Sequence, residues 1–102
     1  MSPLTLTDRG LQSCHDAKLS DALAYLGHAH RISPNYPEVY LVRGQVRSRA
    51  NDIAGAIADL RASARLSPKN PLPLQMLANV YRQAGQADLA GAAQAQAAAL
   101  GP

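Results

Sequence analysis

Residues 34–68 read PNYPEVYLVRGQVRSRANDIAGAIADLRASARLSP, and the rest of the chain is spaced in step with this stretch. Pro68 lies 34 residues after Pro34 and 34 residues before Pro102. Similar residues recur with the same spacing at three further positions: Gly10, Gly44 and Ala78; Ala22, Ala56 and Ala90; and Pro3, Pro37 and Pro71. A fixed period in this range is typical of repeat proteins, whose units stack because none can bury its apolar face alone.

Within this stretch the pattern predicts two helices with a break at Asn51-Asp52. Pro37 suits a first helical turn, where the N–H that it lacks would have no partner in any case. Asp52 is a suitable N-cap for the second helix, along which apolar residues recur at helical spacing. Ser67-Pro68 should end that helix, because the residue before a proline is pushed out of the helical region. No stretch has the alternation of a strand.

The other two repeats are expected to follow the same plan. The turn between their helices is expected at Ala17-Lys18 in the first repeat and at Gly85-Gln86 in the third. We therefore expect a single domain over residues 1–102, with repeats at 3–36, 37–70 and 71–102.

A family resemblance rests on residues of the second and third repeats. In the second they are Tyr40, Gly44, Asn51, Asp52, Ala56, Ile57, Leu60, Leu66 and Pro68. In the third they are Leu74, Leu77, Ala78, Tyr81, Gly85, Ala90, Ala97, Leu100 and Pro102. With these residues and this period the chain resembles the tetratricopeptide repeat family. The first repeat departs from it, since Ser13 replaces an aromatic and Ala17 a glycine. Pentatricopeptide arrays, the nearest competitor, have a longer period and lack these small residues and prolines.

The resemblance implies an all-α fold, an α-solenoid that forms a right-handed superhelix of three antiparallel helix-turn-helix units. The first helix of each repeat would then line a concave groove. In this register the groove residues are Leu4, Thr7, Asp8, Leu11, Cys14 and His15; Glu38, Leu41, Val42, Gln45, Ser48 and Arg49; and Leu72, Gln75, Met76, Asn79, Arg82 and Gln83. Such an apolar stripe with a polar rim suits a peptide or helix with apolar anchors. The alternative is that some of these leucines belong to the core.

We accordingly expect a protein-interaction module that is not an enzyme and needs no cofactor. The alternative is a self-association module that builds a homo-oligomer, a homodimer for example, through its uncapped end or its groove. The chain stops at the repeat boundary, Pro102, whereas solenoids usually need a terminal element with a polar outer face. A fragment of a larger protein or a small stand-alone module would fit this ending.

Co-chaperones of this family grip the acidic tails of heat-shock chaperones with lysines, asparagines and an arginine. The corresponding residues are Thr7, Leu11, Val42, Leu72 and Met76, which offer a carboxylate no cation or amide. The chain is therefore not expected to bind those tails.

The net charge of +3 and the pI near 9.4 raise the question of nucleic-acid binding. The middle repeat concentrates arginines at positions 43, 47, 49, 61 and 65. Recognition of single strands also needs stacking aromatics, and the four tyrosines show no platform spacing. The resemblance implies that Arg43 pairs with Asp59, which gives part of this charge a structural role. Nucleic-acid binding is therefore disfavoured.

The sequence predicts neither a catalytic nor a metal site. Cys14 and His15 are adjacent, so on a helix they point about 100° apart. His28 and His30 have the wrong spacing for two ligands on one helical face. We expect a groove cysteine and surface histidines. The sequence contains neither a long apolar run nor a signal segment, so we expect no membrane insertion and a cytoplasmic location.

Overall fold

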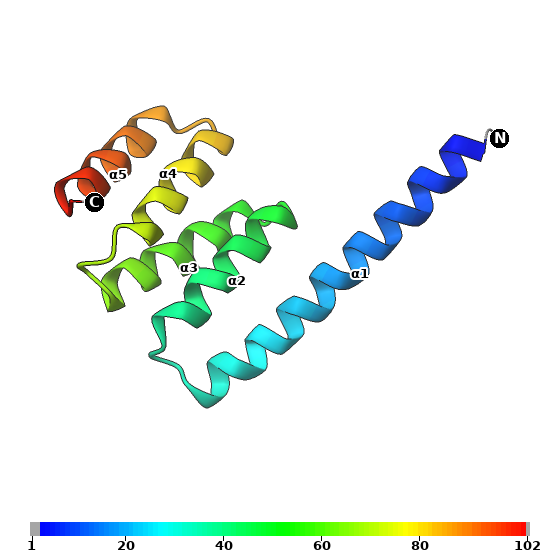
Figure 1. The fold of residues 1–102 in the computed structure, drawn as a ribbon, viewed down its shortest axis with the longest axis horizontal. Coiled ribbons are helices and arrows are strands. Elements are labelled where there is room, and N and C mark those ends of the chain that lie inside the picture. Colours follow the sequence, from blue (N-terminus) through cyan, green and yellow to red (C-terminus); the bar gives the residue numbers. More distant parts are fainter. Residues whose placement is uncertain (1–2, 102) are drawn as a thin grey trace.

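The computed structural model describes the backbone of residues 3–101 and the side chains of residues 18–101. Within the described residues the fold is all-α, as predicted, without strands. Its helices are α1 (Pro3–Ile32), α2 (Pro37–Arg49), α3 (Ile53–Leu66), α4 (Leu72–Gln83) and α5 (Ala87–Ala99) (Figure 1). Each helix packs against the next one along the chain, and α2 also contacts α4.

The turns between α2 and α3 and between α4 and α5 have the same geometry. Each contains one residue in the left-handed conformation, Asn51 with φ 64° and Gly85 with φ 78°. The N–H of this residue donates to the carbonyl oxygen three residues back, at 3.1 and 3.0 Å. The following N–H donates to the carbonyl oxygen five residues back, at 2.8 Å in both turns. These two bonds define a Schellman C-cap. The turns predicted at Asn51-Asp52 and Gly85-Gln86 are therefore confirmed.

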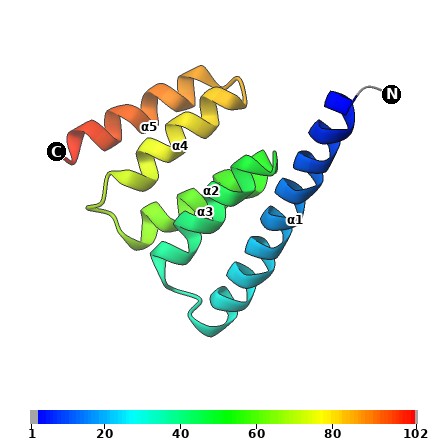
Figure 2. The ribbon, with the colours of Figure 1, turned by 45° about the vertical axis from the view of Figure 1, so that its right-hand side comes forward.

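The first repeat does not form the predicted helix-turn-helix, because α1 continues without a break through Ala17-Lys18 (Figures 1 and 2). Position 17 corresponds to positions 51 and 85, yet it carries an alanine. The left-handed conformation costs a residue with a Cβ roughly 1–2 kcal/mol, whereas glycine and asparagine visit it readily. Alanine is also the strongest helix former. The prediction of a turn was wrong because this residue favours continuing the helix.

Helix α3 begins and ends where local signals in the sequence place it. Asp52 caps α3, since its Oδ1 accepts a hydrogen bond from the Gly55 N–H at 3.0 Å. The same helix ends at Leu66, before Ser67-Pro68, as predicted.

The core lies between α3, α4 and α5. Its buried members are Ala56, Leu60, Leu77, Ala78, Val80, Tyr81, Ala90 and Ala93. Helices α2 and α3 approach each other closely at Gly44. A Cβ added there would lie only 2.9 Å from Leu60 Cγ, so the close approach depends on a residue without a side chain. Burial of these mainly aliphatic side chains stabilises the core by about 25 cal/mol for each Å² of apolar surface that is removed from water.

Candidate functional site

A cavity of about 220 Å³ lies between α2 and α4. Its lining consists of Gln45, Ser48 and Arg49 from α2, Met76, Asn79 and Val80 from α4, and buried Leu60 from α3. Five residues of the predicted groove set are thus brought together, namely Gln45, Ser48, Arg49, Met76 and Asn79. We call the surface formed by Gln45, Ser48, Arg49, Met76 and Asn79 the α2/α4 groove.

Hydrogen bonds hold the polar rim of the α2/α4 groove. Ser48 Oγ donates to Gln83 Oε1 at 3.2 Å, which ties α2 to α4. Arg82 donates to Asn79 Oδ1 at 2.7 Å and also to Gln94 of α5. Arg82 is therefore held by amides at the α4–α5 side, whereas exposed Arg49 forms no ion pair with any described carboxylate. The groove keeps one cation available for an incoming group.

The other predicted groove residues lie in different surroundings. Leu41 is half-buried and packs against the core, which agrees with the alternative assignment of some leucines to the core. Val42 faces a cavity between α1 and α2 instead of α4. Glu38 is exposed and lines the same cavity as Val42, and Leu72, Gln75 and Gln83 are exposed as well. The side chains of Leu4, Thr7, Leu11 and His15, and those of Asp8 and Cys14, lie outside the described residues.

A buried ion-pair network joins α2 to α3 behind the groove. Arg43 donates from Nε and Nη2 to the two carboxylate oxygens of Asp59, both at 2.9 Å, so the predicted pair is confirmed. Arg47 Nη1 donates to Asp59 Oδ2 at 2.9 Å, a contact that the sequence reasoning missed. Arg47 lies four residues after Arg43 and so shares its helical face, a signal that could have revealed it.

The same network reaches α1 through Tyr40. The Arg43 guanidinium lies 5.5 Å from the centroid of the Tyr40 ring, and His30 Nε2 is 2.8 Å from the Tyr40 hydroxyl. The hydrogen bonds to Asp59 raise the pKa of Arg43 above its ordinary value. His30 is half-buried and packs edge-on against Tyr40, so its prediction as a surface histidine was wrong. His28 is exposed, as expected.

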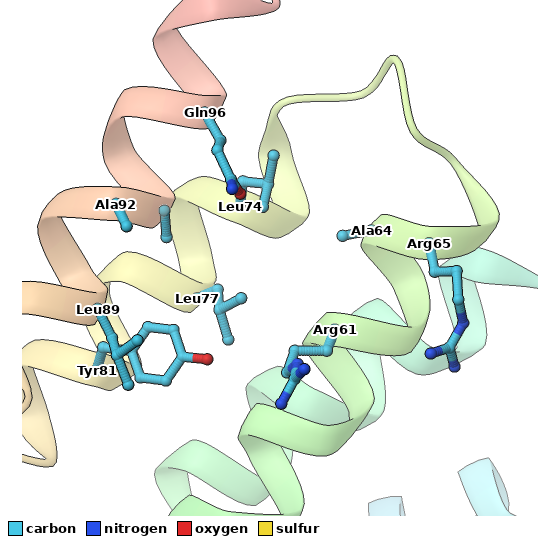
Figure 3. Close-up of a pocket in the computed structure, with 10 residues that line it drawn as sticks. Arg61, Ala64, Arg65, Leu74, Leu77, Tyr81, Leu89, Ala92 and Gln96 are labelled. Carbon is cyan, nitrogen blue, oxygen red and sulfur yellow. The ribbon is translucent and has the colours of Figure 1, made fainter.

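Two further cavities lie outside the predicted groove. One of about 460 Å³ is bordered by α3, α4 and α5, and Figure 3 shows Arg61 turned toward Leu77 and Tyr81 at its edge. The other, of about 360 Å³, lies between α1 and α2. Glu38 lines it together with the mainly apolar side chains of Tyr25, Leu26, Ile32, Tyr36, Val39 and Val42. The sequence reasoning missed this apolar cavity, because it assumed that a helix of the first repeat would cover it.

The chain matches no known protein-family model and no functionally curated protein sequence. Among the side chains that the structure describes, no group of three or more His, Cys, Asp or Glu residues could hold a metal ion. No helix in the described part of the chain combines the length and the apolar character that a membrane crossing needs. Function therefore has to be argued from the surfaces themselves.

Proposed function

We propose that the chain is a tetratricopeptide-type interaction module that binds a peptide or helix of a partner protein in the α2/α4 groove. The observation that carries this proposal is the cavity between α2 and α4, which collects side chains from two helices that are not consecutive. A concave site between helices, with a few polar groups around an apolar floor, is a common place for a ligand.

The family assignment is supported by details that recur 34 residues apart. The two Schellman turns have the same pair of hydrogen bonds. The small residues Gly44 and Ala78 are both buried, and so are Ala56 and Ala90. These correspondences support the reading of residues 37–70 and 71–102 as two stacked repeats of a right-handed solenoid.

The chemistry of the α2/α4 groove suits an extended or helical segment with an apolar anchor. Met76 provides an apolar contact over the core. The amides of Gln45 and Asn79 can donate to and accept from a peptide backbone. Arg49 offers a planar fork of donors that matches a carboxylate. The groove should therefore favour a segment that carries an apolar residue near an acidic one.

A peptide-display selection on the immobilised wild-type protein tests this proposal, followed by calorimetric titration of the enriched peptides. Arg49→Glu should weaken their binding at least tenfold, or about 1.4 kcal/mol. The matched control is Arg65→Glu on α3, another exposed arginine that does not line the groove. A failure to enrich any peptide, or equal losses in both variants, would contradict the proposal.

Nucleic-acid binding has less support than peptide binding. Arg43 and Arg47, two arginines of the basic middle repeat, are engaged by Asp59. Self-association through the last helix also has little support, because apart from Leu89 the exposed positions of α5 carry mainly alanine and glutamine.

A further inference from the structure

One face of α1 lacks the helix that covers the same face of α3 and α5. Asp59 in α3 and Ala93 in α5 are 3% and 5% exposed, each packed against the first helix of its hairpin. Tyr25 occupies the same repeat position in α1 and is 72% exposed. Because α1 has no hairpin partner, the side chain that would pack on that partner lies in solvent.

Two more repeat positions behave in the same way. At the first of these positions Ala56 and Ala90 are buried, whereas Ala22 in α1 is only half-buried. At the second, Ser63 and Ala97 are buried, whereas Ala29 in α1 is only half-buried. The uncovered positions recur at helical spacing along α1. They therefore define one continuous face, which we call the open face of α1 (Ala22, Tyr25 and Ala29).

The open face continues into the cavity of about 360 Å³ between α1 and α2, which Tyr25 and Ala29 help to line. Ile32, 69% exposed, lines the same cavity, together with the exposed side chains of Tyr36 and Val42. A contiguous exposed apolar patch of this kind marks an interaction site on a soluble protein. This surface is separate from the α2/α4 groove, so the inference goes beyond the proposed function.

Residues 3–16 have the sequence of the helix that the open face lacks. Pro3 corresponds to Pro37 and Pro71, and Gly10 corresponds to Gly44 in α2. In this chain, however, the segment continues α1 in a straight line instead of turning back. A helix of 30 residues is about 45 Å long. Its N-terminal half runs past the end of α2 (Figures 1 and 2).

We propose that two chains form a symmetric dimer by exchange of these halves, so that residues 3–16 of each pack on the open face of the other. The midpoint of Pro3–Ile32 falls between Ala17 and Lys18. Two antiparallel α1 helices crossing a twofold axis at that point each supply one donor half and one open face. Such an isologous interface closes at two chains. The exchanged pair is also antiparallel, as the two helices of the α2–α3 hairpin are.

Exchange is favoured over closure within one chain by the residue at position 17. Closure requires a left-handed residue there, as Asn51 and Gly85 are in the other turns. Alanine disfavours that conformation and favours the helix. Replacing it with glycine should therefore allow each chain to cover its own open face.

Light-scattering mass over a concentration series tests the dimer with the full chain. The wild type should show twice the chain mass of 10.8 kDa. Tyr25→Glu should raise the dissociation constant at least tenfold, while the control Leu89→Glu, an exposed apolar residue of α5, should leave it unchanged. Ala17→Gly should return the mass to that of one chain with the helical circular dichroism retained.

A wild type of single-chain mass at every concentration would overturn the proposal, since it would mean that residues 3–16 cover their own chain or nothing. A dimer that survives Tyr25→Glu, or one that Ala17→Gly leaves unchanged, would overturn the exchange.

A spin label on Cys14 gives a second measurement that does not depend on any of these variants. In the exchanged dimer the labels on Cys14 and on Cys14 of the partner subunit lie about 10 Å apart along the helix axis. Dipolar broadening is therefore expected, and a spectrum without it would also reject the arrangement.

Discussion

The ion-pair network around Asp59 predicts that its two arginines contribute unequally to stability. Arg43 forms two hydrogen bonds to the carboxylate and Arg47 forms one, all at 2.9 Å. The side chain of Arg43 is 13% exposed and that of Arg47 is 30% exposed. Because solvent screens the more exposed pair more strongly, the Arg43–Asp59 interaction should be the larger of the two.

The magnitudes follow from burial. Loss of one partner of a buried ion pair typically costs about 3–5 kcal/mol. Asp59→Ala should therefore lower the free energy of unfolding by an amount of that order. In double-mutant cycles with Asp59→Ala, Arg43→Ala should show a coupling energy of roughly 2–3 kcal/mol and Arg47→Ala roughly 1 kcal/mol, values that charge-assisted hydrogen bonds support.

Urea denaturation followed by circular dichroism measures these cycles. Protein concentration must be the same in every experiment, because dimerisation would make stability depend on concentration. Arg61→Ala, an exposed arginine on α3, is the control and should show no coupling to Asp59. Strictly additive effects of Arg43→Ala and Asp59→Ala would refute the reasoning, and so would a larger coupling for Arg47.

Two smaller predictions concern single sites. Gly44→Ala should destabilise the fold by about 1–3 kcal/mol in urea denaturation, because its Cβ would lie 2.9 Å from Leu60 Cγ. Gly91→Ala, whose Cβ meets nothing within 4 Å, should instead stabilise the fold by about 0.5–1 kcal/mol; equal effects would contradict the close helix contact. The hydrogen bond from Tyr36 to Glu38 raises the pKa of Tyr36 above 10.0, so its absorbance titration should have a midpoint higher than that of the Glu38→Gln variant. A midpoint that Glu38→Gln leaves unmoved would rule out this bond in solution.

Several structural features could be predicted because they depend on residues close together in the chain. The turn at Gly85 follows from a residue that accepts a positive φ, and the start of α3 follows from the Asp52 side chain. The error at position 17 has the same local origin. An alanine at the position of Asn51 and Gly85 favours a continuous helix, and this local preference outweighs the repeat spacing.

The candidate site was only partly predictable. Helical periodicity placed Gln45 and Arg49 on one face of α2, and Met76 and Asn79 on one face of α4. Periodicity does not state which of these faces meet across the fold. Leu41 belongs to the same face of α2 by spacing, yet it packs against the core.

The sequence by itself determined the helical class, the repeat spacing and the two hairpin turns, because backbone preferences and capping act over a few residues. Tertiary structure alone decided that Arg47 joins Arg43 on Asp59, that His30 packs against Tyr40, and that one face of α1 stays open. These contacts depend on how helices cross and which side chains fill the space between them. Residues far apart in the chain set that geometry together, and no local pattern contains it.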